Sequence, residues 1–92
     1  MNYRNLRVVK LIQEELGKIM LREMEFPKSV IVTITEVEVL KDLSQAKVRL
    51  GVMPGTAAAE ALNLINEYRP LLQNLLMKKL NIKPMPRIVF CI

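Results

Sequence analysis

The feature that constrains the fold most is a strict alternation of apolar and polar residues in QAKVRLGV, residues 45–52. The apolar positions share one phase and the polar positions share the other, as in a β-strand with one buried and one solvated face. The buried set is Ala46, Val48, Leu50 and Val52. Such a strand needs a second strand beside it and a layer of other elements over its apolar face.

The segment SVIVTITEVEVL, residues 29–40, supplies the second strand, because β-branched residues favour strands. Its parity changes midway: Val30, Val32 and Ile34 share one phase, whereas Val37 and Val39 share the other. We therefore predict a β-bulge near Thr35 or Glu36, which brings both sets to one face. The letters KDLS between the two segments predict a turn, so the pair forms an antiparallel hairpin.

Residues 5–25 predict an amphipathic helix before the hairpin. Asn5 is the expected N-cap, and Pro27 is expected to end the helix. At the other end of the chain, the apolar run in KPMPRIVFCI predicts a third strand.

The stretch between the hairpin and the last strand is helical but contains a proline. AAAEALNLINE, residues 57–67, predicts a helix capped by Thr56. Pro70 would cost about 3 kcal/mol inside a helix, whereas the first helical position tolerates it. We therefore predict a third helix from Pro70 to about Leu80. The fold class is α+β in the order α-β-β-α-α-β, a single domain over residues 1–92, with three helices on one face of a three-stranded sheet.

The composition excludes most catalytic chemistry. With no histidine and one cysteine, the chain cannot build a zinc site of Cys/His type or a nucleophile paired with histidine. The three glycines form no phosphate-binding loop. We expect a protein that is not an enzyme and has no cofactor, no metal site and no small-molecule substrate. No apolar run approaches the roughly 18 residues that span a bilayer, so we expect a cytoplasmic protein with no membrane partner.

The net charge of +5 favours polyanionic partners. Arg4, Arg7 and Lys10 lie near the start of the first helix, where the dipole disfavours cations, so stability does not explain them. Lys78 and Lys79 lie in a last helical turn, where the dipole favours cations and capping suffices as an explanation. Lys47 and Arg49 on the solvated strand face are further candidates, although protection of the sheet against unwanted strand pairing explains them equally well. Lys83 and Arg87, before the third strand, are the last two basic candidates. The hairpin strands carry no aromatic residue, which favours recognition of RNA by backbone charge and shape over base stacking.

The chain resembles the bacterial ribosome-binding factor A family, a type II KH-like domain, over essentially its whole length. RVVKLIQEELGKIMLRE is similar to the family's first helix, and DLSQAKV, residues 42–48, matches its Asp-Leu-Ser-x-Ala-Lys-Val run. Pro86, Ile88 and Phe90 resemble its Pro-x-Leu-x-Phe pattern. The resemblance implies a non-catalytic factor that binds the immature small (30S) ribosomal subunit, contacts 16S rRNA, assists late rRNA processing and acts in cold adaptation. We expect it to act as a monomer.

The resemblance also points to the bend between the second and third helices, where KH relatives present backbone to RNA. The family commonly has Ala-x-Gly there, whereas this chain has Tyr68-Arg69-Pro70. An arginine often found soon after the bend aligns with Gln73. The predicted RNA-binding residues are Arg4, Arg7, Lys10, Lys47, Arg49, Tyr68, Arg69, Lys78, Lys79, Lys83 and Arg87. The alternative is a small α+β protein-interaction module without RNA binding, with Leu11 and Leu21 on its partner surface.

Overall fold

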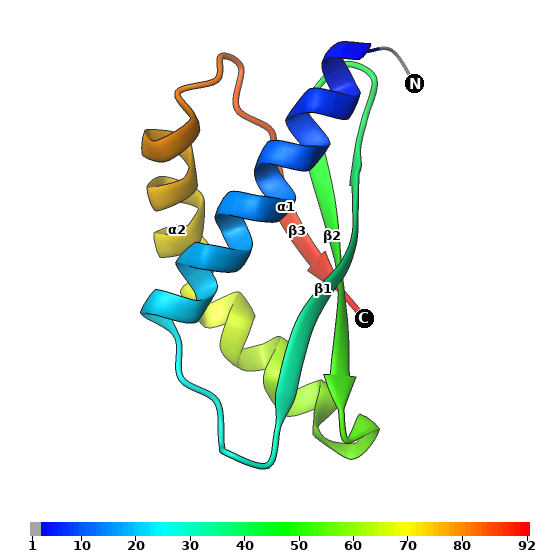
Figure 1. The fold of residues 1–92 in the computed structure, drawn as a ribbon, viewed down its shortest axis with the longest axis vertical. Coiled ribbons are helices and arrows are strands. Elements are labelled where there is room, and N and C mark those ends of the chain that lie inside the picture. Colours follow the sequence, from blue (N-terminus) through cyan, green and yellow to red (C-terminus); the bar gives the residue numbers. More distant parts are fainter. Residues whose placement is uncertain (1–2) are drawn as a thin grey trace.

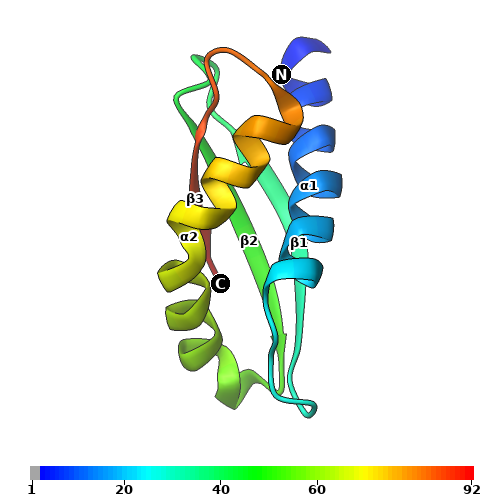
Figure 2. The same ribbon diagram turned by 90° about the vertical axis from the view of Figure 1, so that its left-hand side faces the viewer.

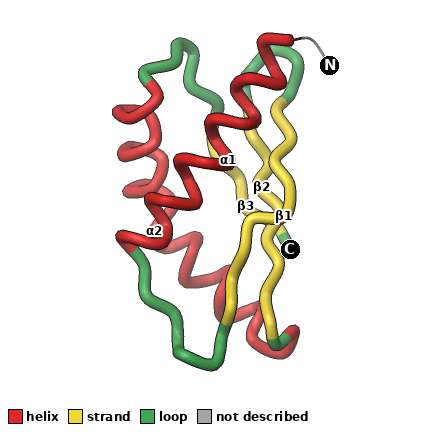
Figure 3. The backbone as a smooth tube through the Cα atoms, viewed as in Figure 1, coloured by secondary structure: helices red, strands yellow, loops and turns green. Residues whose placement is uncertain are grey.

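The computed structural model describes the backbone of residues 3–92 and the side chains from residue 6 onward. Figure 1 shows the arrangement of the elements, and Figure 3 separates helices, strands and loops by colour. The elements are α1 (Tyr3–Glu23), β1 (Ile31–Val39), β2 (Gln45–Met53), a 3-10 turn η1 (Gly55–Ala57), α2 (Ala58–Leu80) and β3 (Arg87–Cys91). The prediction of a mixed α+β domain is confirmed.

The three strands form one sheet in the order β1-β2-β3. β1 and β2 are antiparallel, as the alternating pattern predicts, and β3 runs parallel to β2. The predicted bulge is confirmed: Ile34 pairs with Leu50 and Glu36 with Arg49, so Thr35 is the extra residue. Because of this bulge, Val32 and Ile34 of the first half of β1 face the same side of the sheet as Val37 and Val39 of the second half.

Both helices cover one face of the sheet, and Figure 2 shows them from the side of α2. Inward residues of β2 and β3, including Val48 and Ile88, form one core with Ile12 and Leu16 of α1 and Leu76 of α2, all at 0% exposure. The opposite face of the sheet has no helix over it, and its charged residues are exposed. These are Glu36, Glu38, Lys47, Arg49 and Arg87.

The helix predicted to start at Pro70 is not a separate helix. α2 runs from Ala58 to Leu80 with Pro70 inside it, so the prediction of three helices is wrong, and two helices cover the sheet. Figures 1 and 2 show that α2 changes direction near its middle. An interior proline costs about 3 kcal/mol. Burying Ile65, Leu72 and Leu76, all at 0% exposure, stabilises by about 1.5–3 kcal/mol each, which offsets that cost.

The helix ends also differ from the predicted ones. α1 already includes Asn5, so Asn5 is not its N-cap, and the helix ends at Glu23, before Pro27. Thr56 lies in the 3-10 turn, and α2 begins after Ala57 without a side-chain cap. The turn supplies a backbone bond instead, because the N–H of Ala57 donates to the carbonyl of Pro54 at 3.0 Å.

Candidate nucleic-acid interface

Three segments that are distant in the sequence lie at one end of the molecule. They are the first turns of α1, the turn between β1 and β2, and the last turn of α2 with the connection to β3 (Figures 1 and 2). The exposed cations on these segments form what we call the basic end: Arg7, Lys10, Lys41, Lys78, Lys79, Lys83 and Arg87. Asp42 is the one acidic residue within residues 6–10, 40–44 and 78–87.

The start of α1 contributes Arg7 and Lys10, which are both exposed. Their neighbours Val8 and Ile12 are buried, at 5% and 0% exposure, and attach this part of the helix to the core. The two cations therefore point to solvent. Because α1 begins at Tyr3, both lie beyond its first turn, where the helix dipole has little effect, so the predicted cost of a cation at the helix start does not apply to them. The side chain of Arg4 lies outside the described residues.

The turn between β1 and β2 is held by its own side chains. The Ser44 hydroxyl donates to Asp42 Oδ1 at 2.7 Å, and the Ser44 N–H donates to the same oxygen at 3.0 Å. The bond from the Ser44 hydroxyl, and after it the bond from the Ser44 N–H, lower the pKa of Asp42 below its ordinary value of 3.8. Leu43 adopts a left-handed backbone with φ 62° and buries its side chain at 7% exposure, which anchors the turn. Lys41 is thereby fixed at the basic end, although the sequence did not single it out.

The end of α2 and the start of β3 meet this turn. Asn81 ends α2 in the left-handed conformation, with φ 51°, and its N–H donates to the carbonyl of Met77 at 2.9 Å. The N–H of Arg87 donates to the carbonyl of Ser44 at 3.1 Å, so Arg87 starts β3 directly beside the turn. Lys83 lies on the connection between the two elements and is exposed.

Gln73 ties α2 to the start of β3. Its Nε2 donates to the carbonyl of Pro86 at 3.0 Å, and its Oε1 accepts the N–H of Ile88 at 2.7 Å. Both backbone groups belong to the side of β3 that faces away from β2, where an unpaired edge would invite a further strand. Gln73, which aligns with an arginine of the family, therefore helps to hold the start of β3, and with it Arg87, in place.

Four of the predicted RNA-binding residues lie away from the basic end. Lys47 and Arg49 are exposed on the open face of the sheet, as predicted, but each pairs across the strands with a glutamate. Lys47 is opposite Glu38, and the Arg49 Nε lies 3.6 Å from Glu36 Oε2. Tyr68 and Arg69, named together as the bend residues, are half-buried in the middle of α2, where Tyr68 packs against the core.

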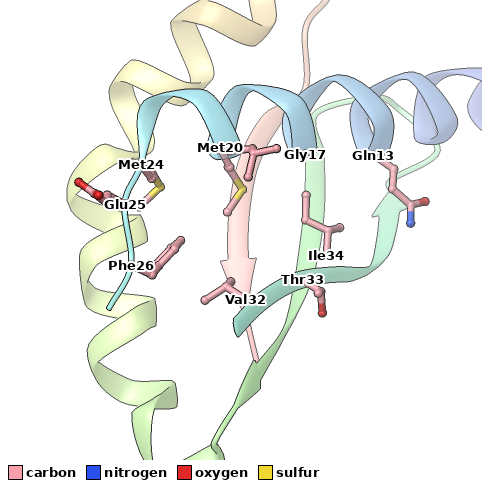
Figure 4. A pocket seen from close by; sticks show the side chains of 10 residues that line it. Gln13, Gly17, Met20, Met24, Glu25, Phe26, Val32, Thr33 and Ile34 are labelled. Carbon is pink, nitrogen blue, oxygen red and sulfur yellow. The ribbon is translucent and has the colours of Figure 1, made fainter. Parts of the chain in front are cut away.

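An apolar cavity of about 490 Å³ lies between α1 and β1. Figure 4 shows Met20, Met24, Phe26, Val32 and Ile34 around it. Leu21 also lines the cavity and is 86% exposed, whereas Leu11, at 38%, does not line it. The two leucines that were grouped as one partner surface therefore do not both line this cavity.

Neither a metal centre nor a membrane span is found in the part of the chain that the structure describes. Within residues 3–92, no three residues among Cys, Asp and Glu form a group that could hold a metal ion. No helix within these residues has both the length and the apolar character needed to cross a bilayer.

The order of helix, hairpin, long helix and parallel third strand defines an α+β domain of the KH-like type, with two helices on one face and a basic end. The sequence pattern of the family Ribosome-binding factor A matches residues 4–92, so the chain belongs to this family. The resemblance noted in the sequence is thereby confirmed.

Individual relatives agree with this assignment. Ribosome-binding factor A of Akkermansia muciniphila is 34% identical over 98% of this chain and 71% of its own length. That of Cupriavidus necator is 38% identical over 95% of this chain and 70% of its own length. The crystal structure of Thermus thermophilus ribosome-binding factor A superposes with a TM-score of 0.80 at 18% identity, covering 95% of this chain and 93% of that one. This last likeness concerns the fold alone.

Proposed function

We propose that this chain binds the small (30S) ribosomal subunit while the subunit is immature and contacts 16S rRNA through the basic end. It assists late rRNA processing and cold adaptation in the cytoplasm without catalysing a reaction, and it acts as a monomer. Family membership supports the ribosomal part of the proposal. A further support is a homology model of the Thermus thermophilus factor, which was fitted into a cryo-EM map of a 30S-RbfA complex; its TM-score is 0.73 at 19% identity, over 89% of this chain and 87% of that one.

The observation that carries RNA binding is the excess of seven cations over one acid at the basic end. Lysine and arginine neutralise phosphates and release their counterions, which supplies sequence-independent affinity. The carboxylate of Asp42 accepts two hydrogen bonds from Ser44, so it is engaged within its own turn. The basic end therefore suits the sugar-phosphate backbone of a folded RNA better than it suits unstacked bases.

Ultraviolet crosslinking to immature small subunits, followed by mapping of the crosslinked peptides, tests this proposal. We expect crosslinks in peptides that carry basic-end residues, such as Lys41 and Lys83. We expect none around Lys28, a cation on the connection between α1 and β1 near Glu25. Crosslinks confined to the segment around Lys28, or failure of the protein to co-sediment with the subunits at low salt, would overturn the proposal.

The alternative function is a protein-interaction module without RNA binding. The observation that favours it is the apolar cavity beside the exposed Leu21. This alternative predicts binding that hardly changes with salt concentration and that is weakened by Leu21→Ser. If Leu21→Ser leaves binding to the subunit intact and salt weakens that binding strongly, the chain binds RNA and the protein-interaction module is excluded.

A further inference from the structure

A second hollow, of about 370 Å³, lies between the later turns of α1 and the last turns of α2. Figures 1 and 2 show these two helical segments side by side. Ile19 and Leu75 lie at its apolar base. Four cations line it, which are Lys18, Arg22, Lys78 and Lys79, together with one acid, Glu15. We call this hollow the interhelical groove.

The acids near the groove only partly balance its cations. The Lys18 Nζ lies 3.5 Å from Glu15 Oε1, and the Arg22 Nε lies 2.8 Å from Glu23 Oε2. The side chains of Lys18 and Arg22 are 73% and 63% exposed, so these pairs are solvated and weak. Among residues 6–92, no ion pair involves Lys78 or Lys79. The groove therefore keeps an excess of positive charge.

Stability alone does not account for this arrangement. The helix dipole favours Lys78 and Lys79 in the last turn of α2. The dipole likewise favours Arg22 in the last turn of α1, but it does not account for Lys18, which lies one turn earlier. Nor does it explain why Lys18 and Arg22, four residues apart on one side of α1, line the same hollow as the two lysines. Like charges placed across a groove repel each other, and a bound anion relieves that repulsion.

We propose that the interhelical groove binds a phosphodiester of the RNA backbone. Arg22 suits a phosphate through its planar guanidinium, which can donate two parallel hydrogen bonds, and the three lysines act as point charges. Lys78 and Lys79 belong to both the groove and the basic end. The RNA backbone thus follows a path from the basic end along the helical side of the molecule, away from the open face of the sheet.

This inference rests on the proposed function, because it extends the same RNA contact to two residues outside the predicted set, Lys18 and Arg22. The test compares three single variants that each remove one charge: Lys18→Gln, Arg22→Gln and the control Lys28→Gln. Affinity of the full chain for a short RNA hairpin and for immature small subunits is measured across a salt series.

We expect Lys18→Gln and Arg22→Gln each to weaken binding and to lower the steepness of log K against log salt by about 0.7–0.9. Lys28→Gln is expected to keep the wild-type steepness, and Lys18→Arg is expected to bind like the wild type because it keeps the charge. Equal urea midpoints of wild type and variants show that folding is unchanged.

Two different failures can be told apart. If Lys18→Gln and Arg22→Gln keep the wild-type steepness while Arg7→Gln lowers it, the groove is not a phosphate site and the proposed function stands. If the wild type binds neither the hairpin nor the subunits, both proposals are wrong.

Discussion

Gln73 is a side chain whose importance lies in hydrogen bonds to the backbone. Replacing it with Met keeps the size of the side chain but leaves the Ile88 N–H and the Pro86 carbonyl without their partner. A half-buried donor left unpaired costs about 1–3 kcal/mol. We predict that Gln73→Met lowers the free energy of unfolding by that amount in urea denaturation.

The matched control is Gln13→Met, the same substitution at an exposed position of α1. It is expected to change the free energy of unfolding by less than about 0.5 kcal/mol, as exposed substitutions usually do. Equal unfolding midpoints for Gln73→Met and wild type would show that the two hydrogen bonds of Gln73 contribute nothing to stability.

Asp42 gives the turn between β1 and β2 a dependence on pH. Its pKa in the folded protein is below its ordinary value of 3.8, so its bonds to Ser44 contribute stability that is fully present above pH 3.8. That contribution is lost as the pH falls through the lower folded-state pKa. We predict that Asp42→Ala lowers the urea midpoint at pH 7 and that the difference from wild type narrows below pH 3.8. A difference that stays constant down to pH 2 would contradict this explanation of the turn.

At the scale of elements, the bend in α2 depends on Pro70. Proline has no N–H, so the carbonyl four residues earlier, that of Asn66, cannot receive the usual helical bond. We predict that Pro70→Ala keeps the fold but changes the angle between the two halves of α2, because the missing bond can then form. Residual dipolar couplings of the two halves measure this angle, and an unchanged angle would show that packing alone sets the bend.

The hairpin could be predicted in detail from the sequence, whereas α2 could not. Alternation in β2 and the phase change near Thr35 are local signals, and they fix both the covered face and the bulge. The continuity of α2 depends on burial of Ile65 and Leu72 against strands that are distant in the sequence. A local rule for Pro70 therefore favoured two helices, and tertiary packing overrode it.

At the scale of the whole molecule, charge is divided along the longest axis, which is 38 Å. The basic end gathers seven cations, whereas residues 25–30 and 53–60, near the other end, carry Glu25 and Glu60 against Lys28 alone (Figure 3). Such an asymmetry orients the protein as it approaches a polyanion. We therefore expect the basic end to meet RNA first.

Single cations could be selected from the sequence, but their convergence could not. Arg7 and Lys10 stood out because the predicted helix start placed them where the dipole disfavours cations. Their proximity to Lys83 and Arg87 depends on α2, which returns the chain to the end where α1 begins, so that β3 starts there and runs parallel to β2. Lys41, Lys18 and Arg22 were missed for the same reason, since only the folded chain shows which cations they approach.

The salt dependence of binding to immature small subunits tests the central claim most directly. We predict that, for the wild type, the logarithm of the binding constant falls linearly with the logarithm of the salt concentration. The double variant Arg7→Gln/Lys10→Gln is expected to bind more weakly, with a slope flatter by about 1.4–1.8, the sum for two lost phosphate contacts. Binding that does not respond to salt, or a double variant with the wild-type slope, would contradict recognition of RNA through the basic end.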